Sequence, residues 1–233
     1  DYREYYHRLR SDPDGDEMQA MVDEISTNVT SFFREKHHFD FLAQRIFGAP
    51  RRRDDGYLHI WSAACSSGEE PYSLAIGVRE HLPDNAHRDV KILATDISQR
   101  ILRKAQRGVY RRQQLAAMDE GLVKRHFLRL GDRDADEWEV RPETRELVRF
   151  RAFNLNGPWP RFRRRFDVIF CRNVMIYFDA ETRQDLINRF ETVLKPGGHL
   201  FVGHAESLTG IRHGLEYAQA TIYRKPAHPA ERA

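Results

Sequence analysis

The stretch over residues 58–73 constrains the fold of this chain more than any other part of the sequence. An apolar run at 58–63, typical of a buried strand, leads through a turn of small residues, Ala-Cys-Ser-Ser-Gly, into a helix. Small side chains let the backbone approach a ligand closely, and Gly68 tolerates positive φ. Two carboxylates, Glu69 and Glu70, begin the helix, where they suit the positive end of its dipole. Because a phosphate on the same amides would meet both negative charges, we expect a ligand without phosphate here.

Further apolar strands follow this helix in the order of an α/β domain. Residues 90–95 form a strand that ends in Asp96, and residues 166–171 and 199–203 form two more. An acidic residue at the tip of the second strand accepts hydrogen bonds from both hydroxyls of a ribose. The sequence therefore predicts a nucleoside-binding α/β domain with S-adenosylmethionine as cofactor. The turn departs from G-x-G-x-x-G, so a dinucleotide enzyme is the weaker interpretation.

Five blocks of sequence occur in an order that is seen in one family. They cover residues 27–35 (TNVTSFFRE), 66–73, 94–97, 171–178 and 195–203. They resemble the chemotaxis receptor methyltransferases of the CheR type, which esterify glutamate side chains on bacterial chemoreceptors. The resemblance extends from Tyr2 to Tyr223. It implies a Rossmann-like, mostly parallel methyltransferase sheet with a small N-terminal helical domain and a small antiparallel β insertion.

The resemblance also predicts where the domains lie. We expect a helical domain at 1–48, truncated at its start, and a methyltransferase domain at 49–226. Two strand-like runs, 138–142 and 147–151, predict an antiparallel insertion over residues 128–150. In some family members this insertion docks a tethering peptide from the receptor C-terminus by strand addition. The loop at 130–137 is acidic and has one glycine instead of several, so we expect no tethering peptide here.

Composition limits the class of protein further. Charged residues make up 31% of the chain, mean hydropathy is −0.70, and no apolar run approaches the roughly 20 residues that span a bilayer. We therefore expect a cytoplasmic monomer with no signal peptide and no membrane insertion. Cys65 and Cys171 are expected as buried, reduced thiols. The histidines show no ligand spacing with Cys, Asp or Glu, so no metal is expected.

The basic residues are clustered although the net charge is only +3. Clusters lie at Arg51–Arg53, Arg111–Arg112 and Arg161–Arg165. A solvated surface is the default interpretation of each cluster. The alternative is a contact face for an acidic partner, which the resemblance identifies as the helical bundle of a chemoreceptor. No aromatic-interleaved basic motif supports a nucleic acid as partner.

Methyl transfer to a carboxylate needs alignment and removal of water more than it needs a base. A free glutamate, with a pKa of about 4.3, is already ionised at neutral pH. A guanidinium holds a carboxylate in fixed orientation, and Arg34 is the candidate for this task. If the segment that contains Arg34 begins a helix, Thr30 and Arg34 lie one turn apart. The alternative is that this segment is only an N-capped surface helix, with a structural role. The resemblance implies that Asn28, Thr30 and Arg34 contact the methionine end of the cofactor and that Arg34 is catalytic.

Other candidate residues come after each of the first two strands and between residues 153 and 156. Glu69 is expected to bind the ammonium group of the cofactor, and Glu70 to be a bystander. Asp96 is expected to bind the ribose. The resemblance assigns Asn154 to a hydrogen bond with the adenine and Leu155 to packing on it.

The loop after the strand at 166–171 carries the last candidates. Arg172 and Asn173 open it at the carboxyl end of the strand, where α/β sheets bind ligands, and both are assigned to the cofactor site. The arginine favours an anionic acceptor. Tyr177 is expected to flank the substrate and, with Arg34, to serve catalysis. The loop lacks the Asn/Asp-Pro-Pro-aromatic motif of enzymes that methylate amines of nucleic acids.

The sequence thus predicts an S-adenosylmethionine-dependent protein-glutamate O-methyltransferase of chemotaxis adaptation. Its products are glutamate methyl esters and S-adenosylhomocysteine. One alternative keeps the cofactor and takes a nucleic acid or a small molecule as acceptor. The other is a non-catalytic, cofactor-binding module of a signalling pathway.

Overall fold

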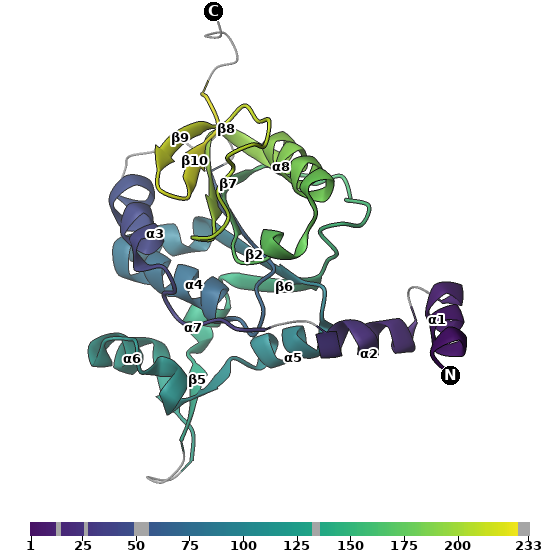
Figure 1. Ribbon diagram of the computed structural model, residues 1–233. Helices are drawn as coiled ribbons and strands as arrows, with labels where there is room; N and C mark the ends of the chain where they lie inside the picture. The colour runs from purple at the N-terminus through teal and green to yellow at the C-terminus, as the bar shows by residue number, and fades with distance from the viewer. Residues whose placement is uncertain (13–14, 26–27, 49–55, 132–135, 228–233) are drawn as a thin grey trace, which may run out of the picture.

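A computed structural model describes residues 1–12, 15–25, 28–48, 56–131 and 136–227 of the chain. Its main feature is a seven-stranded sheet in the order β6-β2-β1-β7-β8-β10-β9 (Figure 1). The strands are β1 (Leu58–Ala63), β2 (Val90–Asp96), β6 (Val148–Ala152), β7 (Phe166–Cys171), β8 (Leu194–Val202), β9 (Glu216–Gln219) and β10 (Ile222–Arg224).

Strand direction sets where a ligand binds. Strands β6, β2, β1, β7 and β8 are parallel, and β10 returns antiparallel to β8, with β9 antiparallel to β10. The chain moves outward from β1 through β2 to β6, then crosses back to β7 on the other side of β1. Because the order reverses between β1 and β7, the carboxyl ends of these strands form the crevice in which such sheets bind ligands. The predicted α/β class with a mostly parallel sheet is confirmed.

Alternation along each strand divides the core into two layers. In β1, Leu58 and Ile60 join one buried cluster, whereas Trp61 and Ala63 join the other. Helix α4 (Glu69–His81) and helix α5 (Gln99–Arg107) contribute to the first cluster, and α8 (Ala180–Val193) contributes to the second. The central strands are therefore buried on both faces, as a parallel sheet covered by helices requires.

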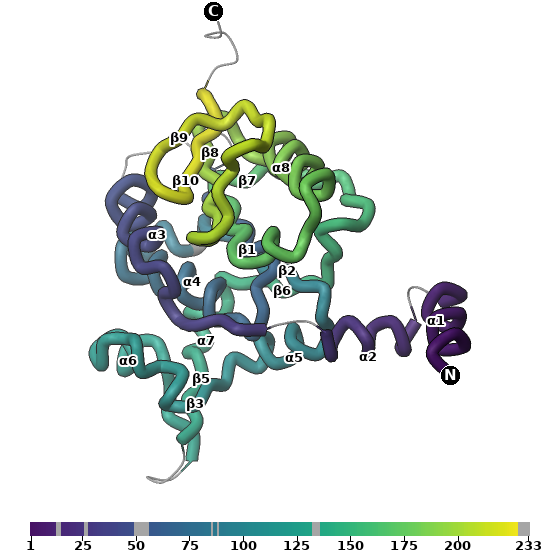
Figure 2. Tube along the Cα trace, in the orientation of Figure 1, coloured from purple at the N-terminus to yellow at the C-terminus, as the bar shows by residue number. Residues whose placement is uncertain are grey.

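The N-terminal helices differ in how they pack against the sheet. Helices α1 (Tyr2–Ser11) and α2 (Asp16–Ile25) lie to one side of the sheet, and α2 packs beside α5 (Figures 1 and 2). Helix α3 (Lys36–Phe41) and the π-helical turn at Leu42–Phe47 bury Phe39, Leu42 and Ile46 in the first core cluster. The hydrophobic core thus shows no break at residue 48. The expected start of the methyltransferase domain at residue 49 and the cluster Arg51–Arg53 lie outside the described residues.

A second, three-stranded antiparallel sheet has the order β3-β5-β4. Its strands are β3 (Val109–Arg111), β4 (Phe127–Arg129) and β5 (Glu137–Val140), with α6 (Glu120–His126) between β3 and β4. The run at 147–151, expected in this insertion, is instead β6, the edge strand that pairs parallel with β2. The prediction was wrong because alternating buried and exposed residues look the same in an edge strand as in an antiparallel hairpin.

The remaining elements are short. They are α7 (Pro142–Arg145) and the 3-10 turns at Asp84–Asp89, Arg112–Leu115 and Met175–Tyr177, labelled η2, η3 and η4. None of the helices in the described part of the chain is long and apolar enough to cross a membrane. Cys65 and Cys171 are both buried free thiols, as predicted.

Candidate active site

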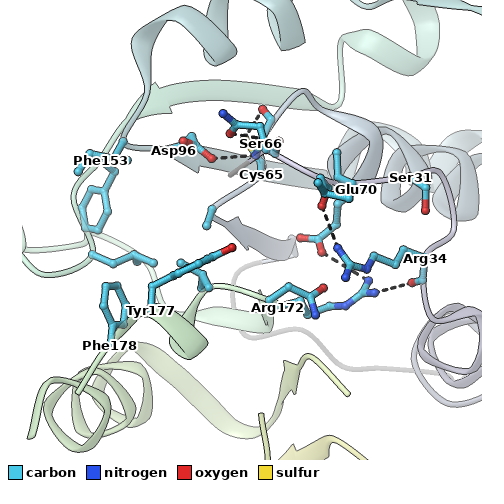
Figure 3. A pocket seen from close by; sticks show the side chains of 18 of the residues that line it. Ser31, Arg34, Cys65, Ser66, Glu70, Asp96, Phe153, Arg172, Tyr177 and Phe178 are labelled. Carbon is cyan, nitrogen blue, oxygen red and sulfur yellow. Dashed lines mark hydrogen bonds and ion pairs between the residues drawn. The ribbon is translucent and has the colours of Figure 1, made fainter. Parts of the chain in front are cut away.

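A cavity of about 340 Å³ opens at the carboxyl ends of β1, β2 and β7 (Figure 3). Nine of the ten predicted site residues line it: Asn28, Thr30, Arg34, Asp96, Asn154, Leu155, Arg172, Asn173 and Tyr177. The exception is Glu69. Segments that are far apart in the sequence therefore meet at one place, which is the crevice that the strand order defines.

The turn after β1 adopts an unusual backbone to reach this cavity. Ala64, Ser66 and Gly68 have φ of 67°, 49° and 98°. At Gly68 a Cβ would lie 2.7 Å from the hydroxyl of Tyr110 and 3.0 Å from the Cβ of Ala105, so only glycine fits. Left-handed backbone at alanine and serine is strained and persists only where the surroundings hold it, which is common at ligand sites.

Asp96 lies at the tip of β2 and is 7% exposed. One carboxylate oxygen accepts the N–H of Ser66 at 2.8 Å, and the other accepts the N–H of Ser98 at 3.0 Å. Burial raises the pKa of this carboxyl, and the backbone donors partly oppose the rise. Because a carboxylate offers about four lone-pair sites, both oxygens keep a free acceptor site. Asp96 is therefore held in position and still able to accept hydrogen bonds from a diol.

The structure places the two glutamates at the start of α4 differently with respect to the cavity. Glu69 is 2% exposed and accepts hydrogen bonds from Ser67 Oγ at 2.6 Å and Gln114 Nε2 at 3.0 Å, away from the cavity. Glu70 lines the cavity and accepts a hydrogen bond from Ser62 Oγ at 2.7 Å. Burial raises the pKa of Glu70, and Arg172 partly offsets this. Successive helical residues point about 100° apart, so only one of the two faces the ligand.

The segment at 28–35 is an irregular turn, and not the helix start that was expected. Helix α3 begins only at Lys36, and Phe33 and Glu35 have φ of 53° and 58°. The cause is packing: Phe32 inserts beside Tyr110, with ring centroids 4.9 Å apart, while Phe33 packs against Phe39. Two consecutive phenylalanines that fill different parts of the core force the backbone out of a helix.

This turn still brings its polar residues to the cavity. Asn28, Thr30 and Arg34 all line it. The Arg34 guanidinium donates a hydrogen bond to the carbonyl of Val29 at 2.9 Å. The Asn28 side chain lies 3.4 Å from Ser66 Oγ. Within the described residues, the hydrogen bond that the Arg34 guanidinium donates goes to a neutral carbonyl, and this partly buried cation lies beside the carboxylates of the site.

Arg172 is more deeply embedded than its prediction implied. It is 6% exposed, and its guanidinium donates a hydrogen bond to the carbonyl of Arg34 at 2.5 Å. It also lies 3.4 Å from a Glu70 oxygen and 3.6 Å from a Glu35 oxygen, above the ring of Phe170. Two protein carboxylates already balance this cation. Arg172 therefore supports the cavity wall, and Arg34 is the cation better placed to meet an anionic acceptor.

The loop after β7 forms another wall. Asn173 has φ of 58°, and Tyr177, at the end of η4, is 59% exposed and points into the cavity (Figure 3). The sequence analysis gave no role to Glu206, whose carboxylate accepts the N–H groups of Asn173 at 2.6 Å and Met175 at 2.7 Å. Sequence reasoning missed this residue because Asn173 and Met175 are about 30 residues away from it in the chain.

The opposite wall is mainly apolar. Leu155 is 7% exposed, and Phe153 and Phe178 also line the cavity. The Asn154 side-chain oxygen accepts the N–H of Asn156 at 2.9 Å, which fixes the turn that presents Leu155. The amide nitrogen of Asn154 is a donor of the kind that suits a ring nitrogen of a base. This wall therefore combines apolar side chains with one side-chain amide.

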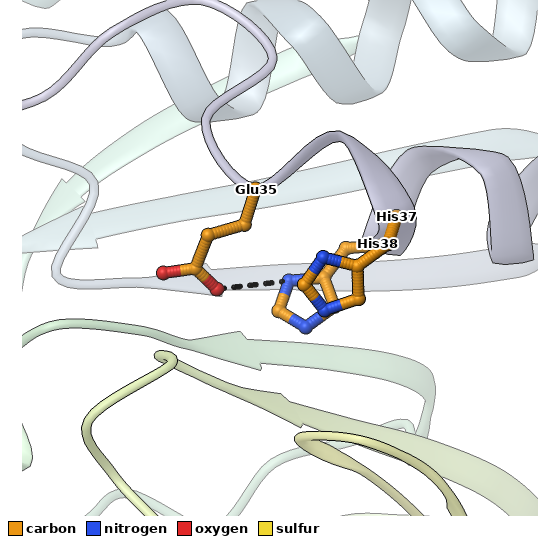
Figure 4. Close-up of side chains that lie close together, drawn as sticks. All are labelled: Glu35, His37 and His38. Atoms are coloured by element: carbon orange, nitrogen blue, oxygen red, sulfur yellow. Dashed lines mark ion pairs between the residues drawn. The ribbon is translucent and has the colours of Figure 1, made fainter.

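Glu35, His37 and His38 are the one group of potential metal ligands found in the described part of the chain, with ligand atoms within 4.8 Å (Figure 4). His38 is fully buried and bonded to Thr221 Oγ1 at 2.7 Å. Burial, with the nearby Arg172 as second cause, lowers the pKa of His38 to about 2, so it is neutral at physiological pH. The Arg172 guanidinium beside Glu35 opposes a second cation, so this cluster suits support of the Arg34 turn better than a metal.

The fold and the cavity together define the class of this protein. A parallel sheet with a buried aspartate at the tip of β2, a glutamate facing the same cavity and an apolar wall has the donors and acceptors for a nucleoside that carries an ammonium group. These are the features of an S-adenosylmethionine-dependent methyltransferase domain.

Comparison with known proteins identifies the family. The family model described as "CheR methyltransferase, SAM binding domain" matches residues 28–224. A chemotaxis protein methyltransferase of Borreliella burgdorferi is 38% identical over 96% of this chain and 80% of that protein. The Escherichia coli chemotaxis protein methyltransferase is 38% identical (96% and 76% covered), and chemotaxis protein methyltransferase 2 of Pseudomonas aeruginosa is 41% identical (95% and 78%). The chain belongs to the CheR methyltransferase family, and S-adenosylmethionine is its cofactor.

Proposed function

We propose that this methyltransferase esterifies glutamate side chains on the cytoplasmic part of chemoreceptors. The observation that carries the proposal is the pairing, within one cavity, of a nucleoside-binding wall with the cation Arg34. The relatives named above are chemotaxis protein methyltransferases, which supports a receptor as acceptor. The products are a glutamate methyl ester and S-adenosylhomocysteine.

In this proposal the residues of the cavity hold the cofactor from three sides. Asp96 would accept hydrogen bonds from the ribose hydroxyls, Leu155 and Asn154 would hold the adenine, and Glu70 would attract the ammonium group. Asn28 and Thr30 complete the wall at the methionine end. When bound there, the cofactor supplies an electrophilic methyl group on a sulfonium.

The acceptor side of the cavity serves alignment. A glutamate carboxylate, with a pKa of about 4.3, arrives ionised, so no residue needs to remove a proton. Arg34 orients this carboxylate through charge-assisted hydrogen bonds, and Tyr177 covers it at the mouth of the cavity. Excluding water from the carboxylate increases its reactivity while the cation keeps it ionised. Tyr177 and Arg34 are thus the two proposed catalytic residues.

The partner and setting follow from the acceptor. We propose that the protein acts as a monomer in the cytoplasm and docks on the receptor helical bundle without inserting into the membrane. A tethering peptide on the small sheet is not part of the proposal. Residues 132–135, within the acidic loop on which that prediction depends, lie outside the described residues.

Transfer of labelled methyl from S-adenosylmethionine to receptor-containing membranes tests the proposal, with exposure to mild base as the second step. Base-labile label on the receptor band supports carboxyl methylation. Base-stable label, or label only on RNA or small molecules, would contradict it and favour another acceptor. Binding of S-adenosylhomocysteine without methyl transfer to a receptor, to RNA or to a small molecule would instead favour a non-catalytic signalling module.

A further inference from the structure

Glu206 is a buried carboxylate whose hydrogen-bond partners are backbone amides. It follows β8 in the turn that begins at Gly203 and is 5% exposed. One oxygen accepts the N–H of Gly203 at 2.7 Å and of Asn173 at 2.6 Å. The other accepts the N–H of Met175 at 2.7 Å and of Ile176 at 3.4 Å. Among the described residues it has no ion-pair partner, so these amides alone stabilise its charge.

Successive backbone N–H groups that converge on one anion form a nest, which here is filled by a side chain of the protein itself. Three of the four amides belong to the loop over residues 173–177, which we call the acceptor loop. Asn173 has left-handed backbone in this loop, a conformation that a non-glycine residue keeps only when its surroundings hold it. The carboxylate of Glu206 provides that restraint.

Gly203 makes the close approach possible. A Cβ at this position would lie 2.5 Å from a Glu206 oxygen, 2.6 Å from the side-chain nitrogen Nδ2 of Asn173 and 2.8 Å from the backbone nitrogen of Asn173. Each of these distances is shorter than van der Waals contact. Only a glycine at position 203 therefore lets Glu206 and the acceptor loop pack this closely at the end of β8.

We propose that Glu206 is a positioning residue for methyl transfer, which fixes the acceptor loop so that Asn173 and Tyr177 face the cavity. Both of those residues line the cavity, whereas Glu206 does not. Within the described residues, Glu206 forms its side-chain hydrogen bonds with Gly203, Asn173, Met175 and Ile176, and none with Ser66, Asp96 or Leu155 of the cofactor wall. Glu206 therefore acts on turnover through the acceptor loop, and because Asn173 is only one of the residues assigned to the cofactor site, cofactor affinity changes much less than turnover. This inference rests on the proposed function for the identity of the acceptor.

The direct test is Glu206→Gln, with the exposed Glu181→Gln in the first turn of α8 as matched control. Glutamine keeps the size of the side chain but turns a donor toward amides that need an acceptor. Misplacing a reacting group by about 1 Å costs about 10²-fold in rate, so kcat should fall by about that factor. The Kd of S-adenosylhomocysteine should change by less than about threefold, as expected when only transition-state alignment is lost. Glu181→Gln should match the wild type.

Two results would overturn the inference. One is a folded Glu206→Gln protein with wild-type kcat. The other is a loss of kcat that is matched by an equal loss of cofactor affinity, which is what a general structural role produces. If the wild-type protein does not methylate receptors, the proposed function is wrong, and this result does not touch the role of Glu206. Glu206→Gln and the wild type are then compared on the acceptor that the wild type does methylate.

Amide exchange in the wild-type protein provides a test that needs no variant. Asn173 and Met175 donate to Glu206, whereas Val174 between them donates to no partner within the described chain. If Glu206 restrains the loop, Asn173 and Met175 exchange at least about tenfold more slowly than Val174. Equal exchange rates for the three amides would contradict the restraint.

Discussion

Two cavities of this protein are lined by arginines, and they differ in how those arginines are paired. In the active-site cavity, Arg172 is buried between two carboxylates and a carbonyl. The second cavity, of about 480 Å³, adjoins the start of β7 and is lined by four arginines, among them the exposed Arg161 and Arg165. Arg189 in its wall pairs with Asp185 at 2.6 Å and lies over the ring of Trp159.

The difference shows that pairing and burial, and not the number of arginines, decide what an arginine does. Removing one partner from a buried ion pair leaves an uncompensated charge away from water, which is strongly destabilising. Removing an exposed arginine loses little, because water and salt already screen its charge. We therefore expect the cluster Arg161–Arg165 to contribute less to stability and turnover than Arg172 and Arg34, which are single arginines in the sequence.

The largest effect is expected for Arg172→Ala. It leaves Glu35 and Glu70 without their shared cation and removes the hydrogen bond to the carbonyl of Arg34. The free energy of unfolding should fall by about 3–5 kcal/mol, as for other broken buried pairs. Urea unfolding measures it, with Arg103→Ala at an exposed position of α5 as control. A change below about 1 kcal/mol would mean that the buried network is worth no more than a surface pair.

The next effect is on cofactor binding. Asp96→Ala removes both acceptor oxygens at the tip of β2, and each hydrogen bond to a charged group is worth about 1.5–3 kcal/mol. The Kd of S-adenosylhomocysteine should rise by at least about 10²-fold in calorimetry. Asp84→Ala, at an exposed position before β2, is the matched control. Unchanged affinity in Asp96→Ala would remove the ribose assignment.

Arg34→Ala should separate catalysis from binding. The acceptor carboxylate loses its orienting cation, so kcat should fall by about 10²-fold while the Kd of S-adenosylhomocysteine rises less than about fivefold. Arg45→Ala, on the π-helical turn after α3, is a control of the same residue type. Steady-state kinetics on receptor membranes measures the split. Full turnover in Arg34→Ala would defeat the assigned role.

A smaller effect is expected from pH. Burial raises the pKa values of Asp96 and Glu70 above those of ordinary carboxyls. Only the ionised forms accept both ribose hydroxyls and attract an ammonium group, so affinity is full above these pKa values and weakens as the pH falls through them. Calorimetry with S-adenosylhomocysteine from about pH 8 down to about pH 4 should show binding that weakens toward the acid end, starting at a higher pH than for ordinary carboxyls. Constant affinity over this range would contradict the link between burial and binding.

Much of the fold and most of the site were predictable from the sequence. The order of strands, the turn of small residues and Asp96 at the end of β2 depend on local patterns, and the structure shows each of them. The choice between Glu69 and Glu70 was not predictable, because both residues begin the same helix and its rotation is set by packing. The turn at 28–35 was also missed, since the separate burial of Phe32 and Phe33 depends on distant residues.

Contacts between distant segments explain the other gaps. The parallel pairing of β6 with β2, the ion pair of Glu35 with Arg172, and the bonds from Asn173 and Met175 to Glu206 all join segments that are separated along the chain. Local periodicity carries no information about such neighbours. The domain boundaries, the oligomeric state and the absence of a tethering peptide stay predictions.

The smallest effect is expected at the second cavity and completes the comparison. The double variant Arg161→Ala/Arg165→Ala removes two exposed guanidinium groups that have no ion-pair partner in the described part of the chain. The free energy of unfolding should change by less than about 0.5 kcal/mol, and kcat and cofactor affinity should match the wild type. Urea unfolding measures the free energy, receptor methylation measures kcat, and calorimetry with S-adenosylhomocysteine measures the affinity. A loss of receptor methylation with intact binding of S-adenosylhomocysteine would show that these arginines contact an acidic partner, because a solvated surface has no means of affecting the acceptor alone.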